Sequence, residues 1–493
     1  MKANLSHRIL LFARYAAGIC IVLFTGCNVG PKYVKPAAPT APAYKEAAPA
    51  AYSAAPPGTW QPAQPQDATL KGKWWEMFNE PELNALEDQL NIDNQNIKQF
   101  FENFMAARAQ VSEARAGYYP TVTANPSLTK TGTGNGVTTG SYSLPVEATW
   151  APDLFGRIRN TVREAQYAAQ VSAADLENER LTEQAALAEY FFQLRGQDQL
   201  QELNNRIVTA YREELNVTRA LVETGIDPPQ AIPQAEEALE DAEAASIGIA
   251  TNRAVYEHAI AMLIGKPAST FSMPVKNLTT PVPAIPVGVP SELLQRRPDI
   301  AAAERTMAEA NALIGIEKAA YYPTLTLSGS GGFSSGSIAS LFSLPALFWS
   351  LGASASQIIF DAGLRKATVQ QYTAMYNADV ASYRQTVLTA FQQVEDYIAT
   401  LRVVSRQIER ENAAINSGQI YVDMETARYQ TGLDPYIDVL IAQLTLLSDQ
   451  ETLVTQRVNE MVASVQLIQA LGGGWDVTKL PAPSAITSTT KIP

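Results

Sequence analysis

The chain has 493 residues, of which 46% are hydrophobic and 17% are charged, and its formal net charge is −12. An acidic chain without basic stretches that alternate with aromatic residues excludes a nucleic-acid partner. Cysteine and histidine are also scarce, with Cys20 and Cys27 both near the amino-terminus and only His258 beyond that region. One histidine cannot form a metal site with so few thiols, so we expect no metal and no cofactor apart from a covalent lipid.

The amino-terminal segment has the layout of a signal peptide. Basic residues come first, and the apolar run from Ala16 to Phe24 is too short to cross a bilayer. The sequence Leu-Phe-Thr-Gly-Cys at 23–27 resembles a bacterial lipobox, in which the cysteine becomes the lipidated first residue of the mature chain. We therefore expect a signal peptide over 1–26 and a palmitate-type lipid on Cys27, the alternative being an ordinary signal that contains a cysteine. Asn28 fits export of such lipoproteins to the outer membrane.

The mature chain repeats itself. Residues 27–70 are rich in Pro and Ala and are expected to form an extended strap along the body. Beyond the strap, Ala-Gly-Tyr-Tyr-Pro at 116–120 returns as Ala-Ala-Tyr-Tyr-Pro at 319–323, and Thr-Gly-Ile-Asp-Pro at 224–228 returns as Thr-Gly-Leu-Asp-Pro at 431–435. The unit of about 205 residues is far longer than solenoid repeats. We expect two structural repeats, over 71–286 and 287–475, and a flexible tail over 476–493.

Each repeat is expected to contain a half-helix, two strands, a long helix and a second half-helix. In the first repeat we place helices up to Gly117, strands at 121–130 and 142–152, a long helix at 159–222 and a half-helix at 230–265. The second repeat has a half-helix at 298–321, strands at 324–331 and 348–360, a long helix at 365–431 and a half-helix at 435–471. Apolar residues from Val380 to Ile408 alternate at spacings of 3 and 4, which indicates a coiled-coil seam.

The half-helices are expected to stack in pairs. Two half-helices together have about the length of one long helix, roughly 90 Å at 1.5 Å per residue. We expect 230–265 to stack on 298–321, and 435–471 to stack on 82–117. Each repeat would then supply one continuous and one composite helical stave.

The strands suit a membrane-spanning sheet. Their lengths, about 9 to 13 residues, are typical of tilted transmembrane strands. Four strands cannot close a barrel, and open sheet edges are not tolerated in lipid. Several chains must therefore share one sheet, and the composition does not choose between two copies with eight strands and three copies with twelve. The sheet also supplies a second membrane attachment, because one acyl group alone anchors weakly.

Several motifs together resemble the TolC-type outer-membrane efflux lipoproteins, a NodT-like family. They are Val-Pro-Ser-Glu-Leu-Leu-Gln-Arg-Arg-Pro-Asp-Ile at 289–300, Gly-Cys-Asn-Val-Gly-Pro-Lys-Tyr at 26–33, Trp-Trp-Glu-Met-Phe at 74–78 and Ala-Leu-Gly-Gly-Gly-Trp at 470–475. The resemblance covers nearly the whole mature chain. It implies an α+β membrane protein in which a homotrimer shares one 12-stranded β-barrel, with four strands per chain, continued by a long α-helical coiled-coil barrel in the periplasm.

The same resemblance implies a role and its partners. The protein would be the passive outer-membrane exit duct of a tripartite drug-resistance pump. A periplasmic adaptor, or membrane fusion protein, would join it to an inner-membrane RND-type transporter. Adaptor docking is implied for the turns that follow the two long helices, at Gly225, Ile226, Gly432 and Leu433.

The turn residues themselves suggest a helix-capping arrangement. Gly can end a helix in the left-handed conformation, Asp can cap the next helix and Pro suits its first position. We therefore expect Asp227 and Asp434 to act as caps. This capping role and the functional roles implied by the resemblance are alternatives for Asp434.

A periplasmic gate is expected near the second turn. Asp438 matches an acidic position that lines the constricted entrance in the family, where three copies would form a ring of like charges. The alternative for Asp438 is a carboxylate favoured by a helix N-terminus. Tyr429 matches a tyrosine of the family's closing latch, and Asp434 completes the predicted gate. The sequence departs from the family's latch, because Asp434 and Ala231 occupy the positions of its arginine and its acidic partner.

These features favour a duct that conducts small molecules from periplasmic partners to the outside. A duct for type I protein secretion and a coiled-coil envelope scaffold that conducts nothing are the alternatives. The sequence contains no phosphate loop, nucleophile elbow or Ser/His/Asp set, so we do not expect an enzyme.

Overall fold

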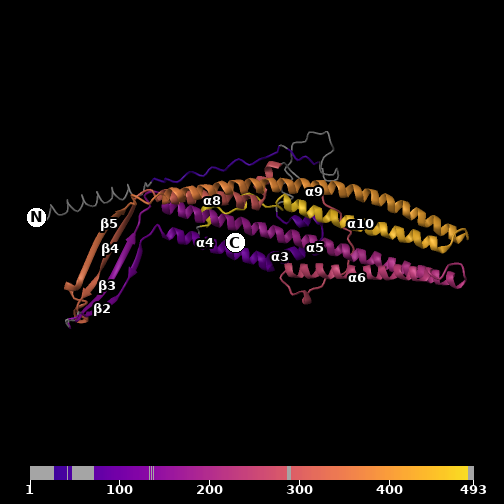
Figure 1. Ribbon diagram of the computed structural model, residues 1–493, viewed down its shortest axis with the longest axis horizontal. Helices are drawn as coiled ribbons and strands as arrows, with labels where there is room; N and C mark the ends of the chain where they lie inside the picture. The colour runs from indigo at the N-terminus through magenta and orange to yellow at the C-terminus, as the bar shows by residue number, and fades with distance from the viewer. Residues whose placement is uncertain are drawn as a thin grey trace.

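The computed structural model describes residues 27–41, 43–46, 72–132, 134, 136, 138–285 and 290–486. The predicted signal peptide over 1–26 lies outside this part of the chain. Figure 1 shows an elongated body with the strands at one end and helices that run lengthwise to turns at the other end. Two 67-residue helices, α5 (Arg157–Glu223) and α9 (Leu364–Gln430), run along it. At 1.5 Å per residue, each is about 100 Å long.

The strands form one antiparallel sheet in the order β1-β3-β4-β5, with β2 also paired to β3. Their bounds are β1 (Thr121–Ala124), β2 (Ser127–Gly132), β3 (Thr138–Trp150), β4 (Thr324–Ser335) and β5 (Leu347–Ser356). The prediction of one strand over 121–130 is wrong, because the ladder is interrupted at Asn125 and Pro126. Proline has no amide hydrogen to donate to a ladder. Since β1 and β2 both pair with β3, the sheet is still four strands wide.

The other strands also differ from their predicted ranges. The predicted strand over 142–152 begins earlier, at Thr138, because β3 pairs with β2 up to the partners Gly132 and Thr138. The predicted strand over 324–331 continues to Ser335, where β4 still pairs with β3. The predicted strand over 348–360 ends at Ser356. Its last partner is Thr324, the first residue of β4, so nothing in β4 remains opposite residues 357–360.

The remaining long helices are half-length and join end to end. They are α3 (Pro81–Asp93), α4 (Gln95–Ala116), α6 (Ala231–Leu263), α8 (Pro298–Ala319) and α10 (Tyr436–Ala470). In Figure 1, α6 continues the line of α3 and α4, and α10 continues the line of α8. Side chains bridge both joints: Asn94 donates to the carbonyl of Leu263 at 2.9 Å, and Arg297 donates to the carbonyl of Ala470 at 3.1 Å.

The predicted pairing of half-helices is therefore wrong. The summed lengths of the half-helices, on which the prediction rests, are nearly the same for either pairing. Helix α5 packs against α4, α6, α8 and α10, so the observed pairing rests on the two joints, at Asn94 and at Arg297. Each composite stave combines half-helices that flank one long helix in the sequence: α3, α4 and α6 flank α5, and α8 and α10 flank α9.

Short elements complete the chain. They are η2 (Trp74–Phe78), η3 (Ala268–Thr270), η4 (Pro290–Glu292), α7 (Leu293–Arg296), η5 (Ile338–Ser340), η6 (Leu344–Ala346), η7 (Val477–Lys479) and α11 (Pro483–Ile486). The largest hydrophobic cluster lies where η2 packs on α5, with Phe78 and Phe192 ring centroids 4.9 Å apart. Among the described residues, no helix combines the length and the apolar character needed to cross a membrane.

Both ends of the described chain lie against the helices. In the strap, the Tyr33 hydroxyl donates to Glu304 Oε1 at 2.7 Å, and the Glu395 carboxylate accepts from the amides at positions 45 and 46 at 2.6 and 2.9 Å. The prediction of a flexible tail over 476–493 is wrong for 476–486. Ile486 is 2% exposed and packs in a cluster with Val111 and Ala169. This apolar contact holds residues near Ile486 against α4 and α5.

Candidate functional site

Two turns close the end of the body opposite the sheet (Figure 1). Gly225 and Gly432 have φ of 77° and 72°, which L side chains rarely adopt. In the first turn the amide of Ile226 donates to the carbonyl five residues earlier at 2.9 Å, and the amide of Leu433 makes the same bond in the second turn at 2.9 Å. These bonds define Schellman motifs. They leave the side chains of Ile226 and Leu433 69% and 70% exposed.

The predicted capping role of the two aspartates is wrong. Helix α6 begins at Ala231 and its N-cap is Gln230, because two prolines follow Asp227 and delay the helix. Helix α10 begins at Tyr436 with Pro435 as its N-cap residue, and neither helix has a side-chain cap. In place of capping, the Asp434 carboxylate pairs with the Arg428 guanidinium, with Nη2 2.9 Å from Oδ1 and a shorter bond from Nε. This hydrogen bonding from Arg428 holds the pKa of Asp434 below its usual value.

The predicted gate residues gather around the start of α10. The Tyr429 and Tyr436 rings lie 4.9 Å apart between centroids, at an angle of 51°. The Tyr436 hydroxyl donates to Glu213 Oε1 on α5 at 2.8 Å, and this hydrogen bond raises the pKa of Tyr436. Asp438 lies in the first turn of α10 and is half-buried. The hydrogen bond from Tyr436 to Glu213 therefore links the second turn to α5, the helix that leads into the first turn.

The bond between Tyr436 and Glu213 was not predicted from the sequence. The two residues are separated by 223 positions, and no local pattern marks Glu213. In the sequence, the one feature that could have suggested this bond is the tyrosine hydroxyl of Tyr436, the first residue of α10. Ala231, for which the resemblance implied the position of an acidic latch partner, is the first residue of α6 and has no charge with which to form an ion pair.

A carboxyl group that titrates near neutrality lies closer to the sheet. Glu309 on α8 is partly buried, and its neighbours Glu164 on α5 and Asp379 on α9 are also acidic. Burial, followed by the charges of these two carboxylates, raises the pKa of Glu309 to about 7. The packing of three helices, and not the local sequence, brings these groups together.

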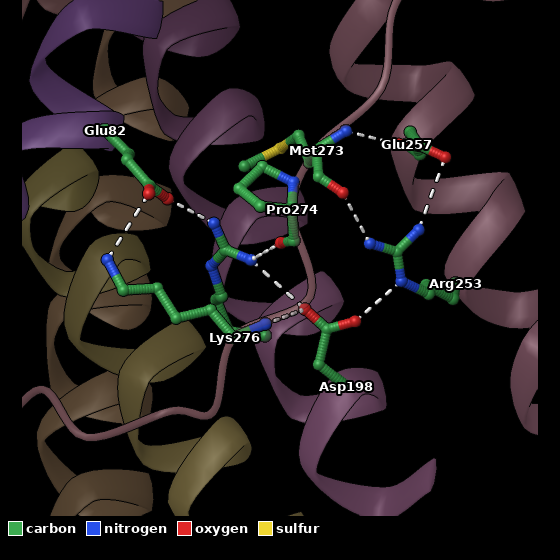
Figure 2. A network of polar contacts seen from close by, with 8 residues as sticks. Glu82, Asp198, Arg253, Glu257, Met273, Pro274 and Lys276 are labelled. Atoms are coloured by element: carbon green, nitrogen blue, oxygen red, sulfur yellow. Dashed lines mark hydrogen bonds and ion pairs between the residues drawn. The ribbon is translucent and has the colours of Figure 1, made fainter.

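A buried polar junction stabilises the middle of the body (Figure 2). At its centre, the fully buried Asp198 carboxylate accepts from Arg253 Nε at 2.6 Å, from Arg195 Nη1 at 3.1 Å and from the Lys276 amide at 3.0 Å. Arg195 also donates to the carbonyl of Pro274 at 2.6 Å and pairs with Glu82. The junction thus fastens residues 273–276, which follow α6, to α3, α5 and α6.

The predicted lipid-bearing residue lies at the opposite end from the turns. Cys27 is exposed, and its carbonyl accepts a hydrogen bond from Arg159 Nη2 at 3.3 Å. Arg159 is in the first turn of α5, directly after β3 in the chain. The amino-terminus of the predicted mature protein therefore lies where the helical body meets the sheet.

Known proteins resemble the chain over most of its length. A family model described as outer membrane efflux protein matches residues 86–266 and 289–473. The antibiotic efflux pump outer membrane protein ArpC and the toluene efflux pump outer membrane protein TtgC, both of Pseudomonas putida, are each 30% identical over 462 residues, which cover 91% of this chain and 93% of the relative. Among solved structures, the outer-membrane channel OprN has a TM-score of 0.80 and 27% identity, with 91% of this chain and 100% of that chain covered.

Proposed function

The chain belongs to the outer membrane efflux protein family, and we propose that three copies of it form the passive exit duct of a tripartite efflux pump. The observation that carries this function is the family match, which extends over both halves of the chain. The family consists of channels and is not a family of enzymes. The protein acts in the outer membrane, with its sheet at the membrane and its helices in the periplasm.

The unpaired edges of the sheet support the proposed homotrimer. In each chain β1 and β2 form one edge and β5 forms the other. Large apolar side chains at these edges are exposed, including Leu128 on β2 and Trp349 on β5. Apolar side chains suit lipid, but the unpaired backbone N–H and C=O groups of an open edge do not, and pairing with neighbouring copies satisfies these groups. Three sheets that are each four strands wide would close a 12-stranded barrel.

The helices present a second surface that suits another copy. Ile247, Val255 and Met262 on α6 are exposed, and their spacings of eight and seven residues place them on one face of the helix. Such an apolar stripe along an outer helix is typical of a helix that packs against a neighbour. The long helices would then form a closed coiled-coil barrel below the sheet.

The partners in the pump follow from the two turns. Ile226 and Leu433 are exposed apolar side chains at the periplasmic end, so they are suited to contact an adaptor that joins the duct to an inner-membrane RND-type transporter. Asp438, Tyr429 and Asp434 lie together at the same end and would form the gate. Cys27 would carry the lipid that, with the barrel, attaches the protein to the outer membrane.

Small organic molecules are the proposed cargo. Two relatives with 30% identity are named for efflux of antibiotics and of toluene. A duct that conducts them needs no tight binding site, which agrees with the proposal of a passive channel gated at its periplasmic end.

Two measurements test the proposed function. The purified protein is incorporated into planar bilayers, and the susceptibility of a deletion strain to toluene and antibiotics is compared with that of the complemented strain. We expect ion conductance and a rise in susceptibility that complementation reverses. The absence of conductance would support a scaffold, and conductance with unchanged susceptibility but loss of a secreted protein would support protein secretion.

A further inference from the structure

The amino-terminal residues of the described chain are held by both repeats. The amide of Val29 donates to the carbonyl of Phe155, just before α5, at 3.3 Å. Asn311 Nδ2, on α8 in the second repeat, donates to the carbonyl of Pro31 at 3.1 Å. The strap therefore begins in a corner between two helices that are far apart in the sequence. Because Phe155 also stacks on Tyr322 with centroids 4.8 Å apart, this corner lies directly beside the start of β4.

Asn28 fits a closely shaped seat in this corner. Its Oδ1 accepts from Asn160 Nδ2 at 3.0 Å and from the amide of Gly30 at 3.2 Å. A Cβ on Gly156 would lie 2.5 Å from Asn28 Oδ1, and a Cβ on Gly315 would lie 2.7 Å from Asn160 Nδ2. Asn160 itself is buried. The glycines on both sides are therefore required for the asparagine pair to fit.

The corresponding corner of the second repeat has no such seat. Gly363 precedes α9 with φ of 91°, as Gly156 precedes α5 with φ of 84°. A Cβ on Gly363 would meet nothing within 4 Å. Four residues after the glycine, the first repeat has Asn160 and the second has Ala367. The two corners share the left-handed glycine, but Ala362 in the second corner also has a positive φ, of 52°. Among the described residues, only the first corner has a side chain that binds the strap.

We propose that Asn28 is a positioning residue that seats the amino-terminus noncovalently in this corner, so that the fold determines where the lipid on Cys27 enters the membrane. The acyl chains would enter the periplasmic leaflet beside Tyr119 and Tyr322, exposed aromatic residues at the foot of the sheet that suit the membrane interface. This inference rests on the lipid attachment proposed above. It adds that the anchor has one defined position relative to the barrel.

Disulfide trapping in the full-length, membrane-embedded protein tests the seat. The pair Val29→Cys and Phe155→Cys joins residues linked by the hydrogen bond at the corner. We expect an internal disulfide to form under mild oxidation, visible as a shift on a non-reducing gel. The control pair combines Val29→Cys with Ala362→Cys, which precedes Gly363 as Phe155 precedes Gly156, and it should remain unlinked within a chain.

The role of Asn28 is tested by substitution within the first pair. Asn28→Ala and Asn160→Ala should each slow disulfide formation by about two- to tenfold, the effect expected for loss of one partly buried hydrogen bond. Because Asn28→Ala already removes the bond that Asn160→Ala removes, the double substitution should be no slower than Asn28→Ala alone. Unchanged trapping rates in both single variants would overturn the role of Asn28, and no trapping in the parent pair would overturn the seat.

Mass spectrometry of the amino-terminal peptide separates this inference from the lipid proposal. A lipid on Cys27 together with trapping supports both statements. Trapping without a lipid would support the position of the amino-terminus and overturn the proposed lipidation of Cys27. A lipid without trapping would support the lipidation and overturn the proposed position. Asn28→Ala should leave the mass of the lipidated peptide unchanged except for the substitution, since the seat acts after the lipid is attached.

Discussion

The polar junction around Asp198 provides a quantitative test of how the body is stabilised. The substitution Asp198→Asn keeps the size of the side chain and removes its charge. It leaves the guanidinium groups of Arg195 and Arg253 without the carboxylate that both contact. Loss of one partner from a buried ion pair costs about 3–5 kcal/mol, because the remaining charge is left uncompensated. Arg195 keeps Glu82 and the carbonyl of Pro274, so we expect the lower value, about 3 kcal/mol.

This free energy converts into a measurable shift of the unfolding temperature. The entropy of unfolding is about 2.1 cal/mol/K per residue, which for roughly 400 ordered residues gives about 0.8 kcal/mol/K. A loss of about 3 kcal/mol should therefore lower the apparent midpoint by about 3–4 °C. Differential scanning calorimetry of the detergent-solubilised protein, at one fixed scan rate and protein concentration, measures the shift.

A matched control uses the same two helices. Arg212 on α5 and Glu243 on α6 form an ion pair 2.8 Å long, with side chains 58% and 41% exposed. Exposed pairs contribute about 0–1 kcal/mol, so Glu243→Gln should shift the midpoint by about 1 °C or less. If Asp198→Asn shifts it no more than Glu243→Gln does, the junction does not stabilise the body and the reasoning from burial is refuted.

Three further predictions concern the proposed gate at the start of α10, the two turns, and Glu309 on α8. Tyr436→Phe removes the hydroxyl that binds Glu213 and should raise the open probability of the isolated channel in bilayers by about two- to tenfold, the effect of one hydrogen bond. Glu213→Gln should act in the same direction. Unchanged gating in both variants would contradict a role of this hydrogen bond in the gate. Replacing Ile226 and Leu433 by Asp should abolish co-purification with the adaptor while single-channel conductance stays at the wild-type value, and retained co-purification would exclude these side chains from docking. The folded state raises the pKa of Glu309 from 4.5 to about 7, so it binds more protons than the unfolded state between these values, and the group's contribution to stability falls as the pH rises through that window. Glu309→Gln should therefore flatten the decline in stability between pH 5 and pH 7, and an equal slope in both proteins would show that this group does not titrate there.

Local sequence determined much of the architecture. Residues 159–222 and 365–431 contain no proline, and the second range has an apolar seam from Val380 to Ile408. These features predict long helices, and the structure has α5 and α9 at 157–223 and 364–430. Gly225 and Gly432 end these helices for a reason that is visible in the sequence, because a left-handed residue after a helix is usually glycine. The resemblance to the efflux family, read from motifs at both ends of the chain, is confirmed by the family match. These features depend on residues within a few positions of one another, or on motifs that are complete in themselves.

Tertiary structure decided which distant residues meet. The half-helix pairing could not be derived from lengths, since the joints at Asn94 and Arg297 depend on where each helix end lies in space. The same holds for the bond between Tyr436 and Glu213. Asp434 looked like a helix cap in the sequence, yet α10 begins at Tyr436 with Pro435 as its N-cap residue, and the Asp434 carboxylate pairs with Arg428. The local sequence limits which bonds a side chain can form, whereas the packing of the helices determines which partner lies close enough to form one.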